Sequence, residues 1–186
     1  ERREAAAHSD GLILLDIDFF KRINDKYGHA AGDKVLIEIS QRLQKECRAS
    51  DKLIRWGGEE FLFLVRNVSS ADLEEMSERI LKAIAKEPIA YEGQEIFVTT
   101  TIGFIRLPFA DIPEHEMDWE KVLQVADMAL YTGKAHGRNR ACGVTDLYVE
   151  YGTARSVLES DLSEALNKNW ISMVTIEGPE SLNRTV

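Results

Sequence analysis

The stretch Gly57-Gly58-Glu59-Glu60-Phe61 lies between two short apolar runs, residues 52–56 and 61–65. Glycine has no Cβ, so two in succession let the chain turn tightly and let backbone approach a ligand. Two strand-like runs joined by such a turn predict a β-hairpin with two carboxylates at its tip. On this stretch alone, an ordinary hairpin with solvated acids and a ligand site are both open.

The composition limits the classes of function. The chain has 186 residues, a formal net charge of −9 and a pI near 5.0. Its length suits one domain with a sizeable core, and its charge argues against a nucleic-acid partner, because a phosphate backbone would be repelled. A small anionic ligand bound through metal ions is compatible with this charge.

Targeting and redox signals are sparse. No run approaches the ~20 apolar residues of a membrane span, and the first residues lack the apolar region of a signal peptide. Cys47 and Cys142 lack metal or redox spacing and fit small apolar core residues in a reduced setting. We therefore expect a cytoplasmic domain without membrane contact, although segments outside this chain could tether the full-length protein to a membrane.

A second stretch places acids at the end of a buried strand. The apolar run of residues 12–15 precedes Asp16-Ile17-Asp18, and sheet proteins often place chemistry where a buried strand ends. Asp16 directly follows the apolar run, so we expect it to be partly buried and to need a partner cation. Asp18 could equally cap the next helix.

Strand and helix patterns alternate along the chain without repeats. The predicted elements are the end of a helix at 1–7, a strand at 12–18, helices at 19–25 and from 32 to 47, the hairpin, a helix at 70–84, a strand at 97–104, a helix from 118 to 137, a final strand at 140–144, a helix at 155–167, a strand-like run at 170–176 and a flexible tail at 177–186. This order predicts an α/β or α+β fold with helices covering the sheet.

Several motifs follow one another in a fixed order between residues 11 and 145. They are residues 14–21 (LLDIDFFK), Asn24-Asp25, Tyr27-Gly28-His29, Gly32-Asp33, residues 55–61 (RWGGEEF), Thr101-Ile102-Gly103, Ala126-Asp127, Lys134 and Gly137-Arg138-Asn139. Together they resemble the GGDEF family of bacterial diguanylate cyclases, in a GGEEF variant. The resemblance implies a nucleotide-cyclase palm-like domain over residues 1–145, with a central sheet of about five strands surrounded by helices. Residues 146–186 would be an extension or a linker toward another domain.

The family condenses two GTP into cyclic di-GMP and releases two pyrophosphates. The resemblance implies that Asp16, Glu59 and the carbonyl of Ile17 are metal ligands, and that Glu60 assists a metal or deprotonates the ribose hydroxyl. Two divalent cations would neutralise charge on the attacking and leaving oxygens. Magnesium, or manganese, suits such oxygen ligands.

Asn24 and Asp33 match the positions that read guanine in the family. A carboxylate accepts from guanine N1–H and N2–H₂, whereas adenine presents an acceptor there. From position alone, both residues could instead be helix caps. The remaining substrate-binding positions that the resemblance implies are the glycines of the hairpin, the backbone around a strand-to-helix turn and two cations: Gly57, Gly58, Phe19, Phe20, Lys21, Lys134 and Arg138.

Two further expectations concern assembly and inhibition. One domain holds one GTP, so the reaction requires a homodimer whose two sites face each other. Arg48 and Asp51 match the Arg-x-x-Asp site at which the family's product inhibits, and Arg79 matches a further arginine of that site. The alternative for Arg48 is a local pair with the acid three residues on.

Some features depart from the family. The chain lacks the Asp-x-Leu-Thr-Gly-Leu stretch and the Asn-Arg pair that members usually carry at the start. Residues 155–173 faintly resemble the start of an EAL-type phosphodiesterase, but Val174-Thr175-Ile176 departs from it and favours a linker. The alternative functions are a catalytically silent GGDEF domain that binds cyclic di-GMP or GTP, and a structural dimerisation domain. Intact Asp16, Glu59 and Glu60 favour the enzyme.

Overall fold

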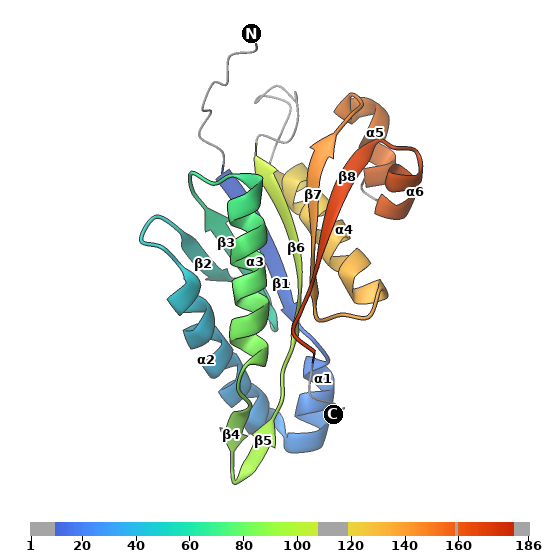
Figure 1. Ribbon diagram of the computed structural model, residues 1–186. Helices are drawn as coiled ribbons and strands as arrows, with labels where there is room; N and C mark the ends of the chain where they lie inside the picture. Colours follow the sequence, from blue (N-terminus) through green and yellow to red (C-terminus); the bar gives the residue numbers. More distant parts are fainter. Residues whose placement is uncertain (1–9, 108–118, 159, 181–186) are drawn as a thin grey trace.

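The computed structural model describes residues 10–107, 119–158 and 160–180 (Figure 1). Its elements in chain order are β1 (Asp10–Ile17), α1 (Phe20–Tyr27), α2 (His29–Glu46), β2 (Lys52–Arg55), β3 (Glu60–Val65), α3 (Ser70–Ala85), β4 (Ile89–Tyr91), β5 (Gln94–Ile96), β6 (Thr100–Leu107), α4 (Trp119–Ala135), β7 (Arg140–Leu147), α5 (Tyr151–Leu158), α6 (Leu162–Asn167) and β8 (Ile171–Glu177). The expected helix end at 1–7, the expected helix start at 118 and the last residues of the expected tail lie outside the described ranges.

The central sheet is mixed and has the strand order β2-β3-β1-β6-β7-β8. Only the β6–β7 pair is parallel, and the other four pairs are antiparallel. Helices α2 and α3 cover one face and α4 covers the other (Figure 1). The predicted α+β fold with a central sheet surrounded by helices is confirmed, with six strands where about five were expected.

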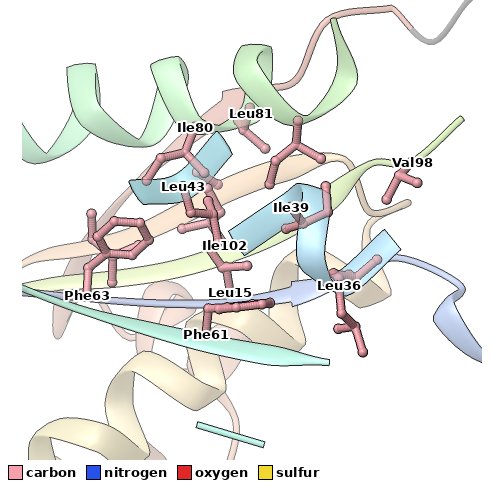
Figure 2. Packing of buried hydrophobic residues seen from close by; sticks show 14 of the residues in the cluster. Leu15, Leu36, Ile39, Leu43, Phe61, Phe63, Ile80, Leu81, Val98 and Ile102 are labelled. Atoms are coloured by element: carbon pink, nitrogen blue, oxygen red, sulfur yellow. The ribbon is translucent and has the colours of Figure 1, made fainter. Parts of the chain in front are cut away.

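The central strand β1 is buried on both faces, which explains its unbroken apolar run. Ile13, Leu15 and Ile17 point into the core shared with α1, α2 and α3, part of which Figure 2 shows around Leu15 and Ile102. Leu12 and Leu14 point into the second core, under α4, α5 and α6. Because side chains alternate along a strand, Asp16 belongs to the α4 side of the sheet.

Glycine at position 103 sets how closely α4 approaches the sheet. A Cβ built there would collide with the backbone carbonyl of Ala126 and the backbone amide of Leu130, both in α4. Helix α4 therefore lies directly against β6 at this point. The residues that follow Leu130 on α4, including Lys134, are consequently held close to the end of β1.

The C-terminal residues extend the same sheet. Strand β8 pairs antiparallel with β7 from Arg140 opposite Glu177 to Leu147 opposite Ile171. Helices α5 and α6 bury residues such as Leu158 and Leu162 in the second core. The boundary after residue 145 stays a prediction, but β7 is followed by a further strand and is not the last one.

Several predicted element limits differ from the structure, and three of them have a clear consequence for the fold. The helix expected to start at Gly32 begins at His29, because the break lies at Gly28, whose φ is 87°. The strand expected from residue 97 begins at Thr100. The single helix expected over 155–167 is two, because the Asp161 side chain accepts from the amides of Ser163 and Glu164 and caps a new helix.

No helix within the described ranges is long and apolar enough to cross a membrane.

Substitution of Gly103 by alanine should destabilise the chain. The added methyl group meets backbone rather than a movable side chain, so α4 must shift, and we expect a loss of about 1–3 kcal/mol in the free energy of unfolding. Urea denaturation measures this loss. Gly152→Ala in α5 is the matched control, since an added Cβ there meets no atom within 4 Å among the described residues. Equal stability of the two variants would contradict the close approach of α4.

Candidate active site

Three predicted acids meet where β1 and β3 run side by side. Asp16 at the end of β1 lies directly opposite Glu60, the first residue of β3. Glu59 precedes it in the hairpin, and its carbonyl accepts a hydrogen bond of 3.2 Å from the amide of Ile17. Asp16 is buried, with 8% of its surface exposed, and Glu59 and Glu60 are half-buried. The antiparallel register therefore brings Asp16, Glu59 and Glu60 together.

Lys134 from α4 provides the cation that Asp16 was expected to need. Its Nζ lies 3.1 Å from Oδ2 of Asp16. Burial raises the pKa of Asp16, and the charge and hydrogen bond of Lys134 oppose that rise. This ion pair connects α4, which covers one face of the sheet, to β1 at the centre of the sheet.

Burial and mutual repulsion also raise the pKa values of both glutamates. For Glu59 and Glu60 the largest cause is desolvation, followed by the negative charge of Asp16, while Lys134 acts in the opposite sense. Asp127 on α4 adds a further negative charge that raises the Glu60 pKa. The site is thus short of positive charge when its acids are ionised.

The donor set fits a divalent cation that shares its coordination with a substrate. No group of three acidic, histidine or cysteine side chains within the described residues is arranged to hold a metal ion alone. Mg²⁺ usually takes only one or two carboxylates and completes its shell with water and substrate phosphates. The carboxylates of Asp16 and Glu59 meet that requirement, and the amide of Ile17 bonds to the Glu59 backbone beside them.

Hydrogen bonds among residues 55–60 stabilise the tip of the hairpin. The amides of Trp56 and Gly57 donate to the carbonyl of Glu60, at 2.9 and 3.3 Å. The guanidinium of Arg55 donates to the carbonyl of Gly58, at 2.7 Å from Nη2 and 3.2 Å from Nε. A Cβ at position 57 would lie 2.8 Å from the Glu60 carboxylate, so glycine makes room for that acid. In the sequence, Arg55 stands out only as the first residue of the motif at 55–61, which does not reveal this contact.

Phe19 occupies a strained turn between β1 and α1. Its φ of 55° is left-handed, which is uncommon for a bulky residue. Two guanidinium groups lie over its ring, with Arg22 at 4.5 Å and Arg138 at 4.6 Å from the ring centroid. Phe20 begins α1 and is buried, and Lys21 is exposed beside it. The predicted backbone turn at Phe19 is therefore in contact with the predicted cation Arg138.

Asn24 lies at the contact between α1 and α2. Its Oδ1 is buried and has no hydrogen-bond partner among the described residues. A Cβ at Gly32 would collide with this oxygen, so the first turn of α2 lies against Asn24. Asp33, the next residue, is exposed. The two predicted guanine-reading positions thus belong to adjoining turns of two helices.

Asp18 is a buried acceptor whose role sequence reasoning missed. Its carboxylate accepts from the hydroxyls of Thr99 and Thr101, at 2.7 and 2.6 Å, and from the amide of Asn139, at 3.0 Å. The bonds connect the end of β1 to the start of β6 and to the α4–β7 loop. The run of three threonines at 99–101 was the available signal, but sequence alone does not show which acid they face.

The three predicted inhibitory-site residues lie near the carboxyl end of α2 and along α3. Asp51 is buried and accepts from the amides of Arg48 and Arg66, at 2.8 and 3.4 Å. The guanidinium of Arg79 is 3.1 Å from the Glu46 carboxylate on α2, and the side chain of Arg48 is exposed. Asp51 therefore shapes the loop, and it bonds to the backbone of Arg48 rather than forming the local side-chain pair.

Comparisons with known proteins show which family the chain resembles in sequence. A family model described as "Diguanylate cyclase, GGDEF domain" matches residues 1–140. Diguanylate cyclase A of Treponema denticola is 40% identical over 132 residues, which cover 69% of this chain and 33% of that protein. Diguanylate cyclase DgcP of Pseudomonas aeruginosa is 40% identical over 144 residues, which cover 75% of this chain and 21% of that protein. The chain thus spans a third or less of the length of these two curated relatives.

Solved structures show the same fold. Diguanylate cyclase SiaD of Pseudomonas aeruginosa, in complex with its activator SiaC, matches with a TM-score of 0.67 and 31% identity over 76% of this chain and 52% of that one. The active GGEEF domain of a diguanylate cyclase from Vibrio cholerae matches with a TM-score of 0.63 and 29% identity over 73% of this chain and 82% of that one. The family model covers most of the chain, and the solved structures share its fold: the chain belongs to the GGDEF diguanylate cyclase family.

Proposed function

We propose that this chain is a diguanylate cyclase domain that condenses two GTP into cyclic di-GMP and releases two pyrophosphates. The observation that carries the proposal is the cluster of Asp16, Glu59 and Glu60 beside Lys134, in a chain whose curated relatives are named diguanylate cyclases. A cluster of acids short of positive charge suits a reaction at phosphate, where both metal ions and cationic side chains stabilise developing charge.

Asp16, Glu59 and the Ile17 carbonyl would hold magnesium or manganese. When bound, such ions neutralise charge on the attacking ribose oxygen and the departing pyrophosphate. Lys134 is close enough to Asp16 to exchange that contact for a phosphate oxygen of the substrate. Arg138, the glycines at 57 and 58 and the backbone amides from Phe19 to Lys21 would bind the rest of the triphosphate.

Glu60 is suited to take the proton of the attacking hydroxyl. In each transfer the ribose 3′-oxygen of one GTP bonds to the α-phosphorus of the other, and the bond from that phosphorus to the β-phosphate oxygen breaks. The hydroxyl proton must leave as this bond forms. Burial and the neighbouring charge of Asp16 raise the pKa of Glu60. The raised pKa lies closer to neutral pH, so Glu60 becomes a better general base.

A second copy of the chain is required because each copy would hold one GTP. Two copies facing each other aim each hydroxyl at the opposite α-phosphorus and produce a two-fold symmetric product. Guanine would be read between Asn24 and Asp33, where the orphaned Oδ1 of Asn24 offers an acceptor at the α1–α2 contact. Cyclic di-GMP would inhibit by binding Arg48 and Arg79, next to the loop that Asp51 holds.

Incubation of the chain with GTP and MgCl₂, followed by chromatographic separation of nucleotides, tests the proposal. We expect cyclic di-GMP and pyrophosphate in a 1:2 ratio, with a rate per enzyme that rises with enzyme concentration as dimers form. Binding of GTP without product, at protein concentrations high enough for dimers, would instead support a catalytically silent domain.

Glu60→Gln should raise the thermal stability of the chain and lower its cyclase activity. The pKa of Glu60 is raised in the folded chain, so the folded state is penalised when this acid is ionised, and the penalty disappears as the pH falls through the raised pKa. Without metal, we expect the variant to melt above wild type at pH 8, and this difference to shrink toward pH 5. Production of cyclic di-GMP should fall about 10²-fold or more, as for loss of a general base.

Thermal melts at several pH values and product assays measure both effects. Glu87→Gln, at an exposed acid after α3, is the control and should leave the melting temperature and the rate near wild type. A Glu60→Gln variant that is less stable than wild type at every pH would contradict the repulsive cluster.

Asp33→Ala should weaken the preference for GTP over ATP. The carboxylate accepts from the donors of guanine, and a mismatched or unpaired polar group costs about 1–3 kcal/mol, so the ratio of kcat/KM for the two nucleotides should fall about ten-fold or more. Competition assays with both nucleotides measure the ratio. Asp146→Ala removes an exposed acid from β7 and should leave it unchanged. An unaltered preference in Asp33→Ala would remove Asp33 from the base site.

Arg48→Ala should relieve product inhibition. Its guanidinium is exposed at the end of α2 and would form charge-assisted hydrogen bonds with the product, each worth about 1.5–3 kcal/mol. We expect the inhibition constant of cyclic di-GMP to rise about ten-fold or more, while the initial rate before product accumulates stays near wild type. Lys45→Ala, one turn earlier on α2, is the control. Undiminished inhibition would show that the product binds elsewhere.

A further inference from the structure

Asn139 joins three separate parts of the chain. Its backbone amide donates to Oδ2 of Asp18 at 3.0 Å. Its backbone carbonyl accepts from the amide of Gly178 at 2.8 Å, and its side-chain Nδ2 donates to the carbonyl of Pro179 at 2.9 Å. One residue thereby connects the end of β1 with the segment that follows β8.

The loop that contains Asn139 has an unusual backbone. Gly137, Arg138 and Asn139 have φ values of 111°, 63° and 46°, so three successive residues are left-handed. Two of them carry side chains, for which this region is unfavourable, although asparagine tolerates it better than most residues. Such a conformation persists only where the surroundings hold it. The three hydrogen bonds of Asn139 supply that support from both sides.

The same loop carries Arg138 and orients its side chain. The Arg138 amide donates to the Gly133 carbonyl at 3.0 Å, and its guanidinium stacks on the ring of Phe19. Asp18 immediately precedes Phe19, just as Arg138 immediately precedes Asn139. The bond between Asp18 and Asn139 therefore connects the side chain of the residue before Phe19 to the backbone amide of the residue after Arg138.

The segment after β8 fits this loop closely. Glu177 pairs with Arg140 at 3.0 Å, and Gly178 follows it. A Cβ at Gly178 would lie 2.7 Å from both Cγ and the backbone oxygen of Asn139 and would collide with Oδ1. We call residues 177–179 the C-terminal latch. Only a residue without a Cβ lets the latch approach Asn139 at this distance.

We propose that Asn139 is a positioning residue for Arg138, and that the C-terminal latch is required to hold it. The inference rests on the proposed function, in which Arg138 binds the triphosphate of GTP. The latch would then contribute to the affinity for the triphosphate, although it is remote in sequence from the family's motifs. It gives residues 177–179 a part in substrate binding.

Two substitutions disturb the contact from opposite sides. Asn139→Asp keeps the shape of the side chain and its tolerance of a left-handed backbone, but it replaces the Nδ2 donor with an oxygen that repels the Pro179 carbonyl. Gly178→Ala leaves Asn139 intact and pushes the latch away. The matched controls are Asn169→Asp, at another left-handed asparagine with φ 55°, and Gly152→Ala, where an added Cβ has space.

The decisive measurement compares two nucleotides by isothermal titration calorimetry with MgCl₂. The probes are a GTP analogue with a methylene group between its α- and β-phosphorus, which the enzyme cannot cleave there, and GMP, which lacks the terminal phosphates. We expect both test variants to bind the analogue about ten-fold more weakly, the loss of one charge-assisted contact, and to bind GMP within about two-fold of wild type. Both control variants should match wild type.

Amide hydrogen exchange tests the latch without nucleotide. Residues 137–140 should exchange faster in both test variants and at the wild-type rate in both controls. Unchanged exchange, unchanged affinity for the analogue, or an equal loss of affinity for analogue and GMP would each overturn the proposal, since general unfolding weakens both ligands alike.

The outcome for the wild-type chain separates the two hypotheses. Binding of the analogue without conversion of GTP would contradict the cyclase, and the selective loss in the two variants would still support the latch. Conversion of GTP by wild type together with unaltered variants would contradict the latch alone. A wild type that binds no triphosphate would contradict both.

Discussion

The structure depends on how the carboxylates at the end of its central strand are compensated. Asp16 and Asp18 are both buried, with 8% and 4% of their surfaces exposed, and a buried charge is costly unless it is paired or hydrogen-bonded. Asp16 is paired with a lysine from α4. Asp18 is satisfied by two hydroxyls and one amide. Each solution ties β1 to a different part of the chain, so the charges organise the elements around the site.

Asp16 and Asp18 differ in whether their carboxylate oxygens can still take part in binding a cation. The oxygens of Asp18 accept three hydrogen bonds from neutral donors, which makes Asp18 part of the framework. Asp16 shares one lysine with Glu59 and Glu60, whose pKa values burial and repulsion raise. This arrangement is unfavourable for folding without cations and favourable for binding them. A site that sacrifices stability in this way is a common feature of enzymes, and it is the physical basis of the proposed cyclase activity.

The C-terminal part of the chain belongs to the same framework. Strand β8 completes one edge of the sheet, and the bonds of Asn139 bring its end to the loop that carries Arg138. Gly103 helps to place the other cation. Because this residue has no Cβ, α4 lies directly against the sheet, and this brings Lys134 to Asp16. Packing at Gly103 thus places Lys134, and the hydrogen bonds of Asn139 hold the loop that carries Arg138.

Local sequence patterns predicted the features that depend on neighbouring residues. The glycine pair predicted the hairpin, the apolar run predicted β1, and the position of Asp16 predicted a buried acid that needs a cation, because strand burial and turn chemistry are properties of a few consecutive residues. The family motifs also led to the fold and to the set of candidate residues.

Only the tertiary structure decided which distant groups meet. It identified Lys134 as the partner of Asp16, Asp18 as an acceptor for Asn139, 121 positions away, and β7 as the strand with which residues 171–177 pair. These contacts depend on strand register and on how closely a helix approaches the sheet. Both are set by packing across the whole domain, so no short stretch of sequence contains them.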